Sequence, residues 1–199
     1  MKWYKYDIRD LSQDEYEKWY SLMSVDKKQR VDRFRFADDK KRTVAGEMLA
    51  RKAIAGWCHV SEEEILFDKL EYGKPFAIGL DVEFNISHSG DLVVCAVDDK
   101  PVGIDVEQIR PMDFDVIKRI CMEDEIAYIL EDNLRDDIFC KITDYLVLTR
   151  FFEAWTLKEA YGKLMGIGIV KECVSDASTL CNVTKDTLGG YIVTICAEL

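Results

Sequence analysis

The chain has 199 residues, of which 48% are hydrophobic and 33% are charged, and its formal net charge at pH 7 is −11. This composition excludes a disordered chain and favours a folded protein with a substantial core, as one domain or two small ones. Its apolar runs are far shorter than the ~20 residues of a membrane span, and its N-terminus lacks the apolar region of a secretory signal, so we expect no membrane association.

The numbers of cysteines and histidines limit the kinds of metal site and disulfide that the chain can form. Seven cysteines without a Cys-x-x-Cys pair argue against paired structural disulfides and a zinc ribbon, and favour a reducing cytoplasm. The only two histidines, His59 and His88, exclude a multi-histidine metal centre. A carboxylate site for a hard cation such as Mg²⁺ remains open.

The charge is unevenly distributed along the chain. Residues 27–52 contain ten lysines and arginines against four acidic residues, a balance of +6, so the remainder sums to −17. A basic block in an acidic chain favours one anionic ligand over general affinity for nucleic acid. The alternative is a solvated helix face.

The first half reads as helices followed by a hairpin. A weak alternation at residues 4–8 predicts an edge strand, and Ser12 with Glu15 forms a capping box that opens a helix to about residue 23. Residues 26–36 predict a short basic helix. Apolar residues at helical spacing predict a core helix over residues 39–58.

The Gly-Lys-Pro sequence at residues 73–75 then predicts a turn. Residues 84–86 predict a strand that runs into a polar turn at 87–90, and residues 91–97 predict the buried return strand of a hairpin. Ser87 and His88 suggest a nucleophile and its base, but no acid is placed to orient the histidine and Gly-x-Ser-x-Gly is absent. A turn histidine bound to an anionic ligand is the better interpretation.

Two carboxylates follow on a predicted strand at residues 101–107 (PVGIDVE). Ile104 and Val106 alternate with Asp105 and Glu107, which puts both carboxylates on one face of the strand. Like charges this close repel each other unless a cation lies between them. Taken alone, a strand with one solvated face is the simpler explanation.

The second half resumes after the break at Arg110-Pro111. Residues 113–121 and 122–132 predict short helices, residues 142–165 a long helix closed by Gly166 and Gly168, and the tail at least two strands with a turn at 189–190. For Glu125, in the second short helix, the default expectation is an exposed glutamate. Helices interleaved with antiparallel hairpins indicate the α+β class.

One face of the long helix mixes apolar and charged residues. Spacings of three and four place Leu148, Phe152 and Trp155 on one stripe. Glu159 and Lys163 fall on the same stripe. An exposed pair at this spacing would stabilise the helix by only ~0.2–0.5 kcal/mol. Charges on an apolar face instead need a partner, which could be a metal ion, a phosphate or a reacting proton.

Four motifs in order resemble the 4′-phosphopantetheinyl transferases of the longer, two-subdomain type that activates peptide and polyketide synthases. They are the basic region around Arg42, Gly-Lys-Pro with Asn-Ile-Ser-His-Ser at 85–89, Gly-Ile-Asp-Val-Glu at 103–107, and Trp-Thr-Leu-Lys-Glu-Ala-x-x-Lys at 155–163. The resemblance covers roughly residues 26–168. It implies two similar α+β subdomains about a pseudo-twofold axis, at 1–101 and 102–199, with coenzyme A between them.

The resemblance also implies roles for particular residues. Asp105, Glu107 and Glu159 would hold Mg²⁺, Glu159 could accept the proton of the attacking serine, and Lys163 could stabilise the leaving phosphate. Contacts to coenzyme A would come from Lys27, Arg30, Arg42, Lys74, Ser87, His88 and Lys163. Lys27 and Arg30 rest on a weaker local match. Glu125 resembles a family position between the last two motifs.

The activity that the resemblance implies is transfer of 4′-phosphopantetheine from coenzyme A to a serine of an apo acyl, peptidyl or polyketide carrier protein. The reaction would depend on Mg²⁺ and release adenosine 3′,5′-bisphosphate, and we expect a monomer. Two alternatives remain: a Mg²⁺-dependent phosphohydrolase, and a non-catalytic protein that binds coenzyme A or a carrier. The presence of both Glu159 and Lys163 argues against lost catalysis.

Overall fold

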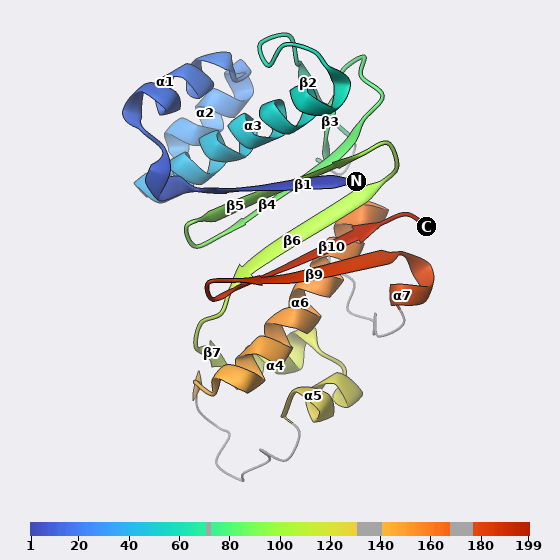
Figure 1. Cartoon of the computed structure of the whole chain (residues 1–199). Helices are drawn as coiled ribbons and strands as arrows, with labels where there is room; N and C mark the ends of the chain where they lie inside the picture. Colours follow the sequence, from blue (N-terminus) through green and yellow to red (C-terminus); the bar gives the residue numbers. More distant parts are fainter. Residues whose placement is uncertain (71–72, 131–140, 168–176) are drawn as a thin grey trace.

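The computed structural model describes residues 1–70, 73–130, 141–167 and 177–199. Two three-stranded antiparallel sheets, with strand orders β1-β5-β4 and β6-β10-β9, lie next to each other between two long helices (Figure 1). Helices mixed with antiparallel strands confirm the predicted α+β class. The pseudo-twofold axis and the boundary between residues 101 and 102 stay predictions.

The first half contains one sheet and the helices that cover it. Its elements are β1 (Lys2–Asp7), the 3-10 turn η1 (Ile8–Asp10), α1 (Gln13–Leu22), α2 (Val25–Arg33), α3 (Ala37–Cys58), β2 (Phe67–Lys69), β3 (Pro75–Ala77), β4 (Glu83–Ser89) and β5 (Leu92–Asp98). β1 is the predicted edge strand. The Ser12 side chain accepts a hydrogen bond from the backbone N of Glu15 at 3.3 Å, which confirms the predicted cap.

The second half repeats the combination of a long helix and three strands. Its elements are β6 (Val102–Gln108), β7 (Met112–Asp113), α4 (Phe114–Ile120), α5 (Glu123–Leu130), β8 (Lys141–Ile142), α6 (Tyr145–Met165), α7 (Ala177–Leu180), β9 (Asn182–Leu188) and β10 (Tyr191–Ala197). The long helix begins later than predicted, because Asp144 caps it by accepting hydrogen bonds from two backbone N–H groups. Gly166 ends it with a φ of 69°, as predicted. Gly168 and residues 131–132 lie outside the described residues.

The hairpin differs from its prediction in one way that matters for the site. Residues 87–89 belong to β4 and pair with residues 92–94 of β5, so the predicted polar turn is shorter and lies at Gly90 and Asp91. The strand continues through these polar residues because the side chains of Ser87 and Ser89 find partners on β6. The polar stretch of the sequence is therefore one face of a strand.

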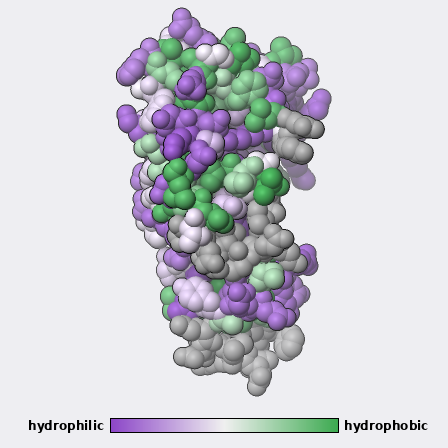
Figure 2. Space-filling view, turned by 90° about the vertical axis from the view of Figure 1, so that its right-hand side faces the viewer, coloured by the Kyte–Doolittle hydropathy of each residue, from purple (hydrophilic) through white to green (hydrophobic). Residues whose placement is uncertain are grey.

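Apolar packing holds the layers together. α3 packs on the first sheet and α6 on the second. Between the two sheets lies a separate apolar cluster, which contains Val94 and Ala96 of β5, Ile104 of β6 and Val193 of β10. Figure 2 shows hydrophobic side chains grouped at mid-height on the face that forms the right-hand side of Figure 1, with hydrophilic residues above them.

A glycine sets the distance between β6 and α6. A Cβ atom built on Gly103 would lie 2.0 Å from the carbonyl oxygen of Ala160 and 2.5 Å from the backbone N of Leu164. These are backbone atoms of a helix and cannot give way locally. This close approach brings the side chains on one face of β6 next to those of α6.

We therefore expect Gly103→Ala to lower the free energy of unfolding by at least ~1–3 kcal/mol, the usual cost of overpacking. The matched control is Gly56→Ala in α3, where nothing lies within 4 Å of the added methyl group. That change should raise stability by up to ~1 kcal/mol, because alanine is the better helix former. Urea denaturation of both variants checks the pair, and equal stabilities would contradict the close approach.

Candidate active site

The site forms where β4, β6 and α6 meet. Asp105 on β6 is buried, with 4% of its surface exposed. Its Oδ1 accepts a hydrogen bond from the ammonium of Lys163 at 2.6 Å and another from the hydroxyl of Ser87 at 2.7 Å. Lys163 also donates to the Ser87 Oγ at 3.0 Å. Three residues predicted for the site from distant motifs are thus in direct contact.

Two further carboxylates lie near Asp105. Burial raises the pKa of Glu159, and the negative charges of Asp105 and Glu107 raise it further, while Lys163 opposes them. Burial also raises the pKa of Glu107, and the charge of Asp105 adds to it. The predicted placement of Glu159 on a partly buried stripe is correct. The three carboxylates interact electrostatically, and an added cation would relieve their repulsion.

The donor set suits Mg²⁺ in its chemistry. Carboxylate oxygens are the hard ligands that this ion prefers, and Oδ2 of Asp105 is buried without a hydrogen-bond partner among the described residues. Within the described ranges, however, no three His, Cys, Asp or Glu side chains are grouped closely enough to hold a metal ion. Here the ammonium of Lys163 provides the positive charge beside Asp105. The three metal ligands stay a prediction.

A cationic region adjoins the carboxylates at the β4–β5 turn. Arg42, near the start of α3, donates to the carbonyl oxygen of Gly90 at 2.8 Å and to Asp39 Oδ1 at 2.6 Å. His88 retains exposed surface, but the packing around its ring lowers its pKa, and the charges of Arg42 and Lys163 lower it further. The structure thus brings two predicted phosphate contacts together, and a bound anion would offset the charge of Arg42 and favour the protonated form of His88.

Lys74 lines a cavity together with Lys163. This cavity of about 420 Å³ is lined by residues of the β2–β3 turn, β4 and the end of α6, including Lys74, Pro75, Asn85, Lys163 and Ile167. Lys74 forms an ion pair with Glu83 at 3.0 Å. The predicted Gly-Lys-Pro turn therefore faces the last turn of α6, although residues 71–72 lie outside the described part of the chain.

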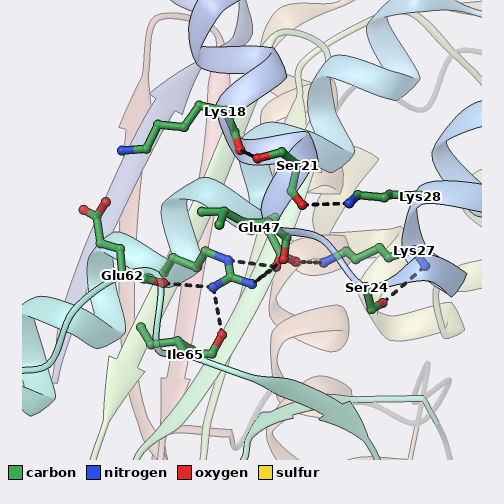
Figure 3. Close-up of polar contacts among 10 residues, drawn as sticks. Lys18, Ser21, Ser24, Lys27, Lys28, Glu47, Glu62 and Ile65 are labelled. Atoms are coloured by element: carbon green, nitrogen blue, oxygen red, sulfur yellow. Dashed lines mark hydrogen bonds and ion pairs between the residues drawn. The ribbon is translucent and has the colours of Figure 1, made fainter.

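Lys27 and Arg30, the two weaker matches to the family, have protein side chains as their partners in this structure. The ammonium of Lys27 forms an ion pair with Glu47, which is only 2% exposed (Figure 3). Glu47 also forms an ion pair with the guanidinium of buried Arg51 at 2.8 Å. Arg51 also donates to the Ile65 carbonyl at 2.7 Å, so this network ties α2 and α3 to the loop before β2. Arg30 is exposed, and its guanidinium lies 6.0 Å from the ring of Phe34. A role for either residue in binding coenzyme A stays a prediction.

Sequence reasoning missed the burial of Lys158, beside the predicted base. Lys158 is only 2% exposed, and its ammonium donates to Glu125 at 2.5 Å and to the carbonyl of Ile120 at 2.9 Å. The default interpretation of Glu125 as an exposed glutamate is wrong, because this pair connects α5 to α6. The sequence analysis also did not single out Asn85 and Ser89, whose side chains bond to β6. The polar residues at 85, 87 and 89 alternate along the strand, and this spacing could have indicated that all three lie on one face.

Comparison with known proteins covers nearly the whole chain. Residues 10–100 match the family model described as "4′-phosphopantetheinyl transferase, N-terminal", and residues 101–198 match "4′-phosphopantetheinyl transferase superfamily". No helix in the described parts of the chain combines the length and apolar character needed to cross a membrane.

Individual relatives agree with the family models. The chain is 36% identical to "4′-phosphopantetheinyl transferase Sfp" of Bacillus subtilis over 82% of its own length and 69% of that protein. It is 37% identical to "4′-phosphopantetheinyl transferase gsp" of Aneurinibacillus migulanus over 75% of its length and 58% of that protein. A third relative, from Xenopus laevis, is "L-aminoadipate-semialdehyde dehydrogenase-phosphopantetheinyl transferase", 31% identical over 72% of the chain and 49% of the relative.

Proposed function

Because the chain belongs to the 4′-phosphopantetheinyl transferase superfamily, a family of enzymes, we propose that it transfers 4′-phosphopantetheine from coenzyme A to a serine of an apo acyl or peptidyl carrier protein. The observation that carries the proposal is the cluster of Asp105, Lys163 and Ser87, joined by contacts of 2.6–3.0 Å, with Glu159 and Glu107 beside it. Three separate family motifs supply these residues.

The reaction forms one bond and breaks one bond at phosphorus. The serine oxygen of the carrier attacks the β-phosphate of coenzyme A, the pyrophosphate P–O bond breaks, and adenosine 3′,5′-bisphosphate leaves with the bonding electrons. Glu159 accepts the serine proton, directly or through water. Lys163 supplies positive charge where the leaving phosphate develops negative charge.

We assign the metal role to the same carboxylates. Asp105, Glu107 and Glu159 would hold Mg²⁺, which supplies Lewis-acid stabilisation of the pyrophosphate charge when bound. The cation would bind Oδ2 of Asp105, which has no hydrogen-bond partner among the described residues, while Oδ1 keeps its bond to Lys163. The side chain of Lys163 is 27% exposed, so its ammonium could also contact a phosphate of the substrate.

Intact mass spectrometry tests the reaction class. An apo carrier protein incubated with the chain, coenzyme A and Mg²⁺ should gain the mass of one phosphopantetheine on its serine. Release of adenosine bisphosphate without a change in the carrier would instead favour a phosphohydrolase. Binding of coenzyme A with no turnover would favour the non-catalytic alternative. Either result contradicts the proposed transfer.

Arg42 and His88 are the proposed grip on the 3′-phosphate of coenzyme A. A phosphate requires several converging donors, and arginine presents two in a fixed fork. The partners that Arg42 has here, Gly90 and Asp39, leave it in place beside His88. Long-range attraction of a polyanion also depends on the basic block, since the remainder of the chain is strongly acidic.

We expect dephospho-coenzyme A to bind the wild type more weakly than coenzyme A, and Arg42→Ala to remove most of that difference. A lost charge-assisted contact costs roughly 1.5–3 kcal/mol, or about ten- to a hundredfold in Kd. Calorimetry with both ligands measures the effect, and Arg33→Ala at the exposed end of α2 is the matched control. If the wild type binds the two ligands equally, Arg42 serves another purpose, and carrier docking is the first candidate.

A further inference from the structure

β4 and β6 are neighbouring edge strands of different sheets, and polar side chains connect them. Asn85 Oδ1 accepts a hydrogen bond from the backbone N of Ile104 at 2.9 Å, and Ser89 Oγ accepts one from the backbone N of Gln108 at 3.1 Å. Both contacts join residues 19 positions apart, so the two strands run in the same direction. Side chains on one face of β4 thus fix the position of β6 along its length.

Ser89 makes a second contact that Asn85 does not. Its hydroxyl donates to Oε2 of Glu107 at 2.7 Å. A hydroxyl has one proton, and the backbone N–H of Gln108 occupies the acceptor side of this oxygen, so the proton is directed at the carboxylate. Glu107 is next to the last residue of β6 and is only partly buried. The bond therefore selects one orientation of its carboxylate.

We propose that Ser89 is a positioning residue that holds Glu107 in the orientation needed to share a divalent cation with Asp105. The inference rests on the proposed function, because it assigns Glu107 to the metal site. Ser87 performs the equivalent contact to Asp105 two residues earlier on the same strand face, at 2.7 Å. Two alternate serines of β4 thus each orient one carboxylate of β6, with Asn85 setting the register between the strands.

The experiment compares Ser89→Ala and Ser89→Thr with the wild type. Hydrogen-bond partners of metal ligands typically contribute 10–100-fold to metal affinity, so Ser89→Ala should weaken binding of Mn²⁺ about tenfold or more. Binding is measured directly from the electron paramagnetic resonance signal of free Mn²⁺ in the presence of coenzyme A. The KM for Mg²⁺ in carrier modification should rise in parallel. Ser89→Thr keeps the hydroxyl and should restore both values.

Two further measurements separate positioning from a purely structural role. The Kd for coenzyme A without metal should change little in Ser89→Ala, whereas the Tm should fall somewhat, because the variant also loses the bond from the backbone N of Gln108. Ser61→Ala is the matched control, because Ser61 donates a similar bond of 2.6 Å to exposed Glu63, far from the site in the sequence. This control should leave Mn²⁺ affinity unchanged. If Ser89→Ala does not fold, Ser89→Cys keeps the size of the side chain, weakens the hydrogen bond and replaces it in every measurement.

The outcomes also distinguish this inference from the proposed function. Equal Mn²⁺ affinity in Ser89→Ala and wild type, or a loss of Tm alone, overturns the inference while transfer to the carrier still stands. A wild type that binds Mn²⁺ but modifies no carrier overturns the transfer, and the Mn²⁺ comparison still decides the role of Ser89. A wild type that binds no Mn²⁺ with coenzyme A overturns the inference.

Discussion

Asp105→Asn should abolish cation-dependent transfer while leaving the fold intact. The amide keeps the shape of the side chain, and its oxygen can still accept the hydrogen bonds of Lys163 and Ser87 that Oδ1 accepts now. It removes the negative charge and the unpartnered oxygen Oδ2, which is the donor available to a metal. Hydrogen-bond partners of metal ligands contribute about 10–100-fold. A direct ligand should contribute at least as much, so we expect the rate to fall by ~10²-fold or more.

Steady-state transfer at increasing Mg²⁺ measures this effect, with coenzyme A affinity in the absence of metal and the Tm as checks on folding. Asp186→Asn is the matched control, because Asp186 is exposed on β9, at the opposite edge of the same sheet from β6. It should behave as wild type. Full activity of the wild type in excess chelator, or of Asp105→Asn at low Mg²⁺, would show that Asp105 has no metal role.

Glu159→Gln should lower kcat by a factor on the order of 10²–10⁴, the usual contribution of a positioned acid or base. Its carboxylate lies among Asp105, Glu107 and Lys163, whose charges all act on its pKa. If Glu159 only stabilised the helix, its loss would cost a few tenths of a kcal/mol and leave the rate unchanged. Single-turnover transfer with saturating coenzyme A and carrier separates these two expectations.

Glu153→Gln provides the matched control for this measurement. Glu153 lies on the same helix and faces Lys185 at 3.8 Å across a partly exposed surface, so it is an ordinary ion pair of the kind that Glu159 would be otherwise. Its loss should leave kcat within a factor of two or so, in line with the small value of exposed pairs. Equal kcat in both variants would reject a chemical role for Glu159.

Lys163→Ala should slow the same step and also destabilise the protein. The variant leaves Asp105 buried without its cation, and breaking a buried pair in this way costs about 3–5 kcal/mol. Saturating Mg²⁺ should recover part of the lost Tm, since a cation bound at Asp105 replaces the missing charge. The rate should remain low, because the leaving phosphate still lacks its lysine. Recovery of both together would show that Lys163 is only a structural counter-ion.

Local rules determined most of the elements of this chain and the residues of its candidate site. Helical spacing identified the stripe on which Glu159 and Lys163 lie, and alternation put Asp105 and Glu107 on one strand face. The cap at Ser12 likewise depends on residues close in sequence. A sequence carries this information because each pattern is set by the geometry of a single helix, strand or turn.

Contacts between elements were decided by the tertiary structure. Periodicity says which face of an element a residue occupies, but it does not say how far two elements are shifted along each other. The close approach of Gly103 to α6 sets that shift and places Lys163 on Asp105, 58 residues away. The same limit concealed the bond of Lys27 to buried Glu47 and that of Ser89 to Glu107. Each needs the packed positions of two elements, which no local pattern contains.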